Sequence, residues 1–225
     1  MTIRESRLKG IYTEKKGKKI IFLTKNLTPG KTVYGEHTYR LDDEEYREWS
    51  FTRSKLGAAL AKNITQLGMY PGSKVLYLGA STGTTSSHVS DVVGEEGFVF
   101  VLDFAPRTTR NLVYLCELRK NMSPIIADAK HPERYAGQVA LVDCVFQDIA
   151  QRDQAEIFLK NCNAFLKRGG FGVLAVKARS VDVAKKPRQV FQEVRAYLEK
   201  HMIIVDYKEL DPYEKDHCIF VCKKK

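Results

Sequence analysis

The sequence predicts an α/β fold in which a mainly parallel sheet is covered by helices on both faces. From residue 71 onward, segments with strand-like and helix-like patterns alternate, which is typical of consecutive βαβ units. The apolar run 75–78 passes directly into a turn of small residues at 79–83, as a strand does when it leads into a helix. The first 49 residues carry only short β-prone runs between Lys-rich and Gly/Pro turns, so we expect a small antiparallel unit ahead of the sheet.

Composition limits the class of protein. The 225 residues are 44% hydrophobic, which is enough for a sizeable core, and the formal net charge of +10 favours a polyanionic partner such as nucleic acid. The five cysteines form no C-x-x-C pair, which indicates buried reduced thiols and no metal site. No apolar run approaches the roughly 20 residues of a membrane span, and the first 30 residues are too charged for a signal peptide. We therefore expect a soluble, cytoplasmic protein without a membrane partner.

The N-terminal part is expected to end close to Trp49, the only tryptophan. Short β-prone runs cover residues 19–24 and 32–39. Residues 54–67 then carry apolar side chains mostly at helical spacing, with Ser54 as the N-cap. A boundary near residue 50 predicts a small antiparallel β domain and a larger α/β domain, at 1–52 and 53–225.

The larger part alternates strands with helices and closes with two strands. The expected strands cover residues 75–79, 98–103, 124–127, 141–147, 171–176, 202–210 and 218–222. The expected helices cover residues 84–93, 107–120, 153–167 and 187–200. In the third of these helices, Asp153 and Glu156 are placed for a capping box at the start, and Gly169 with Gly170 for the end.

Charged residues stand at the ends of four consecutive predicted strands. They are Asp103, Asp128, Asp148 and Lys177. Ligands of such sheets bind outside the carboxyl ends of the parallel strands, so these side chains are expected to line one edge together with the glycine turn. A single acidic residue there is usually a helix cap or a solvated turn, but four charged residues in register indicate a binding site. If the last strand runs antiparallel, its neighbour in the chain, His217, reaches the same edge.

The spacing between the turn and the first acidic residue indicates a nucleoside-bearing cofactor. Asp103 follows Gly79 by 24 positions, close to the offset of about 20 at which a carboxylate binds a ribose diol. Asp128 is then placed to reach the base. Ser81 stands where the dinucleotide fingerprint has a glycine, which argues against a bound pyrophosphate. The turn and Asp103 nevertheless leave an NAD-dependent dehydrogenase open as an alternative.

Six short motifs are spread over almost the whole chain. They read YREW at 46–49, RSKL at 53–56, VLYLGASTGTT at 75–85, DIAQ at 148–151, KARSVD at 177–182 and PYEKDH at 212–217. Together they resemble the fibrillarin family, the ribose 2′-O-methyltransferases of box C/D RNA-guided particles. The resemblance implies a class I S-adenosylmethionine-dependent methyltransferase fold, which is Rossmann-like, with a seven-stranded, mostly parallel sheet and one antiparallel strand near the edge. It also implies S-adenosylmethionine as the cofactor and S-adenosylhomocysteine as its product.

The resemblance also assigns roles to residues. The family's catalytic Lys-Asp-Lys-His set corresponds to Lys55, Asp148, Lys177 and His217. Together with the glycine turn, the family's cofactor positions predict a site built from Gly79, Ala80, Ser81, Gly83, Thr84, Thr85, Asp103, Phe104, Asp128, Ala129, Asp148, Ile149, Ala150 and Gln151. The chain departs from the family in two places. Asp103 replaces the usual Glu, and its shorter side chain weakens the contact to the diol; Arg152 replaces a common Pro and adds a charge near the site.

The expected reaction is in-line methyl transfer to a ribose hydroxyl, with positioning supplying much of the rate. Asp148 is expected to orient the reacting groups. The proton acceptor is either Lys177 or Asp148, with His217 orienting one of them or carrying the proton onward. Basic residues that follow the strands are candidates for phosphate contacts with RNA, namely Lys130, Arg134, Arg179, Lys185, Lys186 and Arg188.

Partners follow from the resemblance as well. They are the box C/D guide RNA, the target rRNA and also tRNA, a Nop-family scaffold protein and, through the particle, a kink-turn-binding ribosomal-type protein. The family's eukaryotic Gly/Arg-rich extension is not in this sequence, so the chain resembles an archaeal member. A structural subunit of the particle that has lost catalysis is the non-enzymatic alternative, against which the intact Lys-Asp-Lys-His set weighs.

Overall fold

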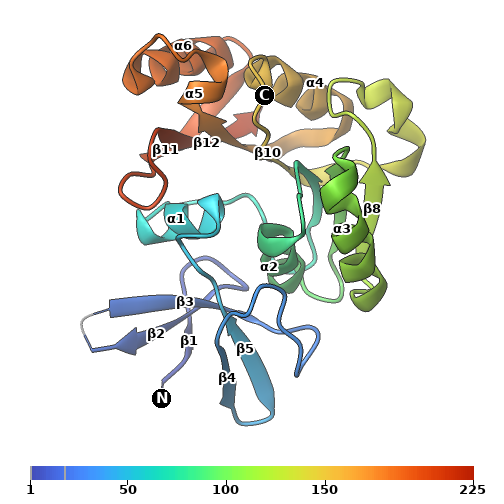
Figure 1. Cartoon of the computed structure of the whole chain (residues 1–225), viewed down its shortest axis with the longest axis vertical. Helices are drawn as coiled ribbons and strands as arrows, with labels where there is room; N and C mark the ends of the chain where they lie inside the picture. Colours follow the sequence, from blue (N-terminus) through green and yellow to red (C-terminus); the bar gives the residue numbers. More distant parts are fainter. Residues whose placement is uncertain (1, 18) are drawn as a thin grey trace.

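The computed structural model of the protein describes residues 2–17 and 19–225 and contains two separate sheets (Figure 1). In the N-terminal sheet all neighbouring strands are antiparallel, in the order β1-β2-β3-β5-β4. Its strands are β1 (Arg4–Glu5), β2 (Tyr12–Lys16), β3 (Lys19–Lys25), β4 (Thr38–Leu41) and β5 (Glu44–Glu48). The small antiparallel unit expected ahead of the main sheet is confirmed.

One expected strand of this unit is largely wrong. Residues 32–37 form no strand, and β4 begins only at Thr38. The carboxylate of Glu36 accepts hydrogen bonds from the backbone N–H groups of Val33 and Tyr34, at 3.0 and 2.8 Å. These local hydrogen bonds fold the segment into a turn, which outweighs the β propensity of Val33 and Tyr34.

The second sheet has seven strands in the order β11-β12-β10-β9-β6-β7-β8. Its strands are β6 (Lys74–Leu78), β7 (Phe98–Asp103), β8 (Met122–Ile126), β9 (Val142–Gln147), β10 (Leu166–Lys177), β11 (Met202–Glu209) and β12 (His217–Lys224). Among the described strands of this sheet, β12 alone runs antiparallel to its neighbours, β10 and β11, and the other pairs are parallel. The predicted seven-stranded, mostly parallel sheet with one antiparallel strand near the edge is therefore confirmed.

Helices pack on both faces of this sheet. They are α1 (Lys55–Ala61), α2 (Thr84–Val93), α3 (Pro106–Leu118), α4 (Gln154–Phe165), α5 (Ala178–Val181) and α6 (Pro187–Glu199). Helices α1 to α3 share one hydrophobic core with the sheet, and α4 and α6 share the other, on the opposite face (Figure 1). In β6, Val75 and Tyr77 belong to the first core and Leu76 and Leu78 to the second, because successive side chains of a strand point to opposite faces. No helix in the described part of the chain is long and apolar enough to cross a membrane.

Helix α1 begins at its predicted N-cap, Ser54. The Ser54 hydroxyl accepts hydrogen bonds from the backbone N–H of Gly57 at 3.1 Å and from the indole N–H of Trp49 at 2.9 Å. The helix stops at Ala61, earlier than expected, and Asn63 then adopts a left-handed conformation with φ of +56°. That conformation cannot continue a right-handed helix.

The two end signals predicted for α4 are wrong. Asp153 makes no side-chain cap at the start of the helix, because its carboxylate pairs instead with the Lys130 ammonium at 3.1 Å. Helix α4 ends at Phe165, before Gly169 and Gly170, which lie inside β10. The register of β10 against β9 shifts over this stretch, and Gly169 has φ of +75° there. The glycines therefore serve an irregularity in a strand rather than the end of a helix.

A buried ionic cluster joins the N-terminal sheet to α2. Arg47 of β5 lies 2.6 Å from Glu36 and 2.9 Å from Asp91 of α2. Arg119, at the end of α3, lies 2.6 Å from the other oxygen of Asp91. The side chains of Arg47, Asp91 and Arg119 are fully buried. We call Glu36, Arg47, Asp91 and Arg119 the Asp91 cluster. The expected division of the chain into domains 1–52 and 53–225 stays a prediction.

Replacing Arg47 with methionine is expected to lower the free energy of unfolding by about 3–5 kcal/mol, because Glu36 and Asp91 then lose a buried partner. Chemical denaturation measures this value. The matched control is Arg40→Met, since the Arg40 guanidinium is largely exposed beside Glu45 and its loss should change the value by less than about 1 kcal/mol. If Arg47→Met costs no more than the control, the cluster does not hold the two sheets together.

Candidate active site

Glycines at the end of β6 bring distant segments close together. Gly79 has φ of +83°, and a Cβ there would overlap the carbonyl oxygen of Asp148 and lie 2.8 Å from Cγ2 of Ile149. Gly83 has φ of +96° and stands at the N-cap of α2, where a Cβ would overlap the side chain of Leu115. Glycine meets both requirements, because it has no Cβ and adopts positive φ without strain. The segment after β9 can therefore pass directly over the end of β6.

A cavity of about 310 Å³ opens beside this turn. It is lined by Gly79, Ser81, Leu102, Asp103, Phe104, Asp128, Ala129, Asp148, Ile149, Ala150 and Gln151. All of these except Leu102 were predicted for the cofactor site from the sequence. Leu102 gave no signal because an apolar residue near the end of a strand looks like any other core residue. The structure thus gathers the three acidic strand ends and the glycine turn around one cavity, and Lys177 lies outside it.

The other residues predicted for the cofactor site lie outside this cavity. Ala80 and Thr85 are buried, and the Thr85 hydroxyl donates a hydrogen bond to Ser54 at 3.1 Å. Gly83 caps α2. Thr84 lines a second cavity, of about 330 Å³, between the N-terminal segment and α3.

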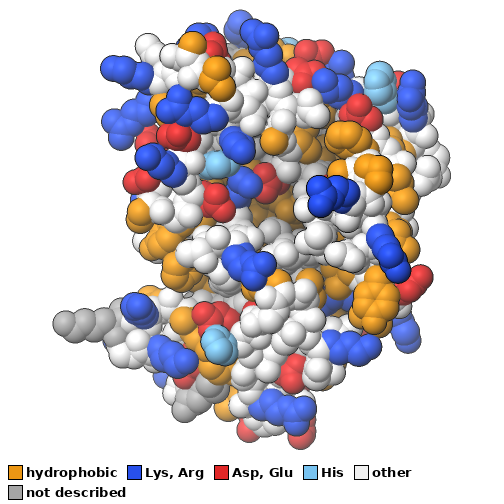
Figure 2. Space-filling model, in the orientation of Figure 1, with side chains coloured by type: hydrophobic (Ala, Val, Ile, Leu, Met, Phe, Trp, Pro, Cys, Tyr) orange, Lys and Arg blue, Asp and Glu red, His pale blue; other side chains and the backbone are white. Residues whose placement is uncertain are grey.

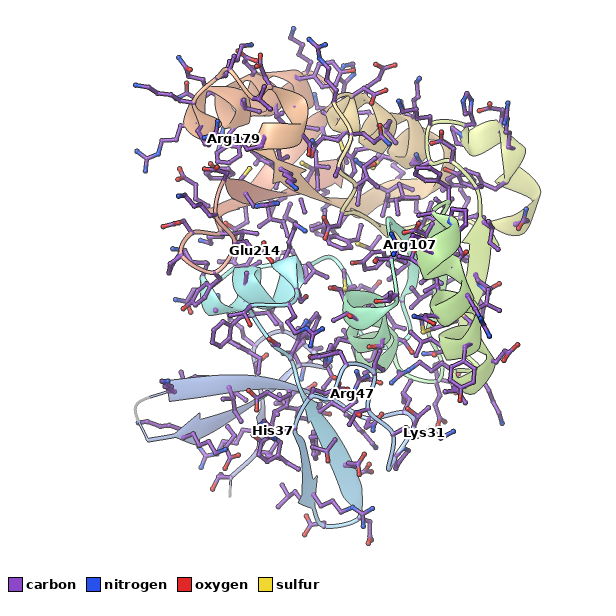
Figure 3. All side chains as sticks on the ribbon, viewed as in Figure 1. Lys31, His37, Arg47, Arg107, Arg179 and Glu214 are labelled. Atoms are coloured by element: carbon purple, nitrogen blue, oxygen red, sulfur yellow. The ribbon has the colours of Figure 1, made fainter. Side chains whose placement is uncertain are left out.

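The sequence patterns did not single out the basic residues that line the second cavity. The second cavity is also lined by Lys31 and Arg53, and the Arg53 guanidinium lies 5.2 Å from the centre of the Tyr34 ring. Figure 3 shows Lys31 on the N-terminal segment that faces α3. Their signal was weak because isolated basic residues in loops are usually solvated surface charges.

The carboxylate of Asp103 holds the glycine turn in place. Its Oδ2 accepts a hydrogen bond from the Ser81 N–H at 2.7 Å, and its Oδ1 accepts one from the Ala105 N–H at 2.9 Å. Ser81 itself adopts a positive φ of +52°, a conformation that non-glycine residues rarely take. Each carboxylate oxygen can accept more than one hydrogen bond, so Oδ2 keeps the capacity to accept one from a ligand hydroxyl.

Lys55 and Asp148 form the central ion pair of the site. The Lys55 ammonium lies 2.9 Å from Oδ1 and 3.0 Å from Oδ2 of Asp148. The residues come from the first turn of α1 and the end of β9, and both side chains are 21% exposed. A half-buried pair is screened less by solvent than an exposed one. Because Asp148 also lines the cavity, the pair connects α1 to the predicted cofactor site.

The sheet places Lys177 next to His217. Lys177 is the last residue of β10 and His217 is the first of β12, and the antiparallel register makes them direct neighbours. Among residues 2–17 and 19–225, no acidic group lies within ion-pair distance of the Lys177 ammonium. The segments that follow β10 and precede β12 are tied by Arg179, which lies 3.0 Å from Asp216 (Figure 3). The catalytic roles of Lys55, Asp148, Lys177 and His217 remain predictions.

The tautomer of His217 follows from its hydrogen bond. Its Nδ1 lies 2.7 Å from the backbone carbonyl oxygen of Lys215. A carbonyl only accepts, so Nδ1 carries the proton, and Nε2 of the neutral ring is an acceptor. Burial lowers the pKa of His217 below 6.5, and the Lys55 ammonium lowers it further, against the opposite effect of the Lys215 carbonyl. At pH 7 the ring is therefore mainly neutral, with Nε2 able to accept a proton.

Most of the residues predicted to contact RNA make ion pairs at the surface. Lys130, Arg179, Lys185 and Arg188 pair with Asp153, Asp216, Glu193 and Glu209, respectively. No ion pair of Arg134 or Lys186 is found within the described residues. Figure 2 shows Lys and Arg side chains interspersed with acidic ones over α5 and α6. Within residues 2–17 and 19–225, no three His, Cys, Asp or Glu side chains are grouped so that they could hold a metal ion.

The His217 ring is expected to titrate with a midpoint below 6.5, and its Nδ1 is expected to carry the proton of the neutral form. Nitrogen NMR of the imidazole measures both. In Lys55→Met the midpoint should rise, because one of the charges that oppose protonation is removed. A wild-type midpoint above 6.5, or a neutral ring protonated at Nε2, would contradict this account.

Comparison with known proteins identifies the family. The family model described as Fibrillarin matches residues 2–225. A fibrillarin-like rRNA/tRNA 2′-O-methyltransferase from Pyrococcus horikoshii is 47% identical over 224 residues, covering 99% of this chain and 98% of that protein.

Solved structures agree with this match over the whole chain. The Aeropyrum pernix fibrillarin in complex with natively bound S-adenosyl-L-methionine has a TM-score of 0.90 and 39% identity, covering 99% of this chain and 98% of that one. A fibrillarin/Nop5p complex contains a chain with a TM-score of 0.88 and 35% identity, covering 99% of this chain and 100% of that one. The resemblance inferred from the sequence motifs is confirmed, and this chain belongs to the fibrillarin family.

Proposed function

We propose that this protein is an S-adenosylmethionine-dependent RNA 2′-O-methyltransferase that modifies rRNA and tRNA. One observation carries the proposal. Asp148 lines the cavity beside the glycine turn and is also paired with Lys55, so the predicted cofactor and catalytic sites share a residue. The 47% identical relative from Pyrococcus horikoshii bears the name of this activity.

The residues of the cavity fit S-adenosylmethionine. Gly79 lets the segment after β9 pass close to the end of β6, and both segments line the cavity. Asp103 Oδ2 is available to a ribose hydroxyl, and Asp128 suits the amino group of a purine base. The Phe104 ring, which is 56% exposed, lines the same cavity and offers an apolar face to a base. The acidic residues also suit the positive charge of a sulfonium group.

The chemical task of the protein is to activate a weakly acidic hydroxyl. When bound, S-adenosylmethionine supplies a methyl group that is already activated for transfer. Asp148 is held by Lys55 through both carboxylate oxygens, so its orientation is restricted. We therefore assign Asp148 the role of orienting the reacting groups, which supplies rate through positioning.

We assign proton acceptance to Lys177 together with His217. Asp148 is the poorer candidate, because both of its oxygens already face the Lys55 ammonium. The neighbouring His217 keeps Nε2 as an acceptor. The proton of the ribose hydroxyl then passes to a free lone pair, either that of the neutral Lys177 amine or that of His217 Nε2, as in general base catalysis.

The proposed partners follow the same reasoning. A 35% identical fibrillarin was solved as a complex with Nop5p, which supports a Nop-family scaffold as a partner of this chain. We also propose that guide RNA selects the target nucleotide in a box C/D particle, and that the kink-turn-binding protein is reached through that particle. The net charge of +10 supports contact with RNA.

Binding and transfer assays test the activity. Calorimetric titration should detect S-adenosylmethionine and not NAD, since the turn with Ser81 lacks the glycine at which a pyrophosphate approaches. Labelled methyl should then appear on a 2′-hydroxyl of target RNA in a particle reconstituted with guide RNA and scaffold. Binding of NAD alone would support a dehydrogenase. Cofactor binding without transfer in a complete particle would support a structural subunit.

Replacing Lys177 with alanine should lower the single-turnover rate of methyl transfer by roughly 10²–10⁴-fold, because a proton acceptor is lost. Affinity for S-adenosylmethionine should change little, since Lys177 does not line the cavity. Single-turnover transfer and calorimetry measure the two quantities. The control is Lys200→Ala, at the exposed end of α6. A transfer rate for Lys177→Ala close to that of the control would exclude the catalytic role.

A further inference from the structure

The last residues of β10 extend beyond the strand that pairs with them. Strand β9 ends at Gln147, and its final pair with β10 is Leu174 with Gln147. The chain then leaves the sheet through 148–151, which line the cavity, and returns as α4. Among the described strands, Lys177 therefore has no partner on the β9 side, although it supplies a predicted catalytic amine.

The side chain of Gln154 takes the place of the missing strand. The Lys177 N–H donates a hydrogen bond to Gln154 Oε1 at 3.2 Å, and Gln154 Nε2 donates to the Lys177 carbonyl at 3.4 Å. A primary amide offers the same donor and acceptor as a peptide group. The Gln154 amide thus gives the Lys177 backbone the acceptor and the donor that a longer β9 would have offered.

The same amide reaches the cofactor segment. Gln154 Nε2 also donates to the carbonyl oxygen of Gln151 at 2.8 Å. Gln154 is fully buried, and its backbone carbonyl oxygen accepts a hydrogen bond from Gln147 Nε2 at 2.6 Å. One buried side chain therefore ties the end of β10 to the segment that lines the cavity.

The opposite side of the strand end is held by β12. The Ala178 N–H donates to the carbonyl oxygen of Asp216 at 3.0 Å, beside the pair of Lys177 with His217. The backbone of Lys177 is consequently restrained from both sides. On the β9 side, the restraint that the structure shows comes from Gln154.

We propose that Gln154 is a positioning residue for methyl transfer, which fixes Lys177 relative to the cofactor segment 148–151. The inference rests on the proposed function, because it takes Lys177 as a catalytic group and the cavity as the cofactor site. Gln154 does not line the cavity and acts through Lys177 and Gln151. A displacement of about 1 Å between reacting groups costs on the order of 10²-fold in rate, so loss of this tie should appear in transfer rather than in binding.

Two variants separate the hydrogen bonds of Gln154. Gln154→Leu removes both the donor and the acceptor at nearly constant volume. Gln154→Glu keeps an acceptor for the Lys177 N–H but loses the amide donor toward Gln151 and the Lys177 carbonyl. The matched control is Asn121→Leu, which removes another buried amide with backbone partners, at Ser90 and Gly94, away from the site.

The experiment measures single-turnover methyl transfer in the reconstituted particle at saturating S-adenosylmethionine, well below the melting temperature of every variant. Calorimetry gives the cofactor affinity, and thermal unfolding gives the stability. We expect Gln154→Leu to lose roughly 10–100-fold in transfer rate with cofactor affinity within about 3-fold. Gln154→Glu should lose less, and Asn121→Leu should lose stability but keep the wild-type rate.

Three results would overturn the proposal. The transfer rate of Gln154→Leu could match that of Asn121→Leu, which would make Gln154 a structural residue. Its cofactor affinity could instead fall by much more than about 3-fold, which would make Gln154 a cofactor-binding residue. If Gln154→Leu does not fold, a wild-type rate for Gln154→Glu overturns the proposal in the same way. Failure of the proposed function is recognised separately, because the wild-type particle would then transfer no methyl group.

Discussion

The contact between the two sheets depends on one fully buried carboxylate, that of Asp91. It lies within 2.9 Å of Arg47 and 2.6 Å of Arg119, and it also accepts a hydrogen bond from the Thr24 hydroxyl at 2.8 Å. A buried charge costs several kcal/mol unless it is paired and hydrogen-bonded. Its partners come from β5, from β3 and from the end of α3. Both sheets must therefore be folded and docked before Asp91 is satisfied.

This contact extends to the predicted active site through a few residues. His88 of α2 stacks against Trp49 with ring centres 4.8 Å apart, and burial lowers the pKa of His88, so the ring is neutral beside two guanidinium groups. Trp49 donates to Ser54, which caps α1. The next residue, Lys55, holds Asp148. The N-terminal sheet thus helps to place Lys55, although none of its described residues lines the cavity beside the glycine turn.

The predicted catalytic groups meet at one edge of the main sheet, but they are placed there by two different parts of the fold. Asp148, Lys177 and His217 stand at strand ends, so the order and register of the main sheet bring them to one edge. Lys55 comes from α1, which precedes the sheet in the chain and packs against one face of it. The Lys55–Asp148 pair joins the residue from α1 to the residues at the strand ends. A change in how α1 packs would therefore alter the site without any change in the strands.

The amino-acid sequence alone predicted the fold, the glycine turn and the edge of the sheet at which the charged residues gather. These features depend on apolar periodicity, on glycines that must adopt positive φ, and on the rule that carboxyl ends of parallel strands meet. Local signals failed where a hydrogen bond or an ion pair that they do not predict took the same group. Asp153 pairs with Lys130 rather than capping α4, and Glu36 folds a β-prone segment into a turn.

Other features were decided by the tertiary structure. The pairing of Lys55 with Asp148 joins residues 93 positions apart, and the Gln154 amide meets Lys177 across 23 positions. No periodicity in the chain encodes such a distance, because it is set by how α1 and α4 pack against the finished sheet. The sequence therefore determined which chemical groups are present and which edge they share, whereas only packing decided which of them touch.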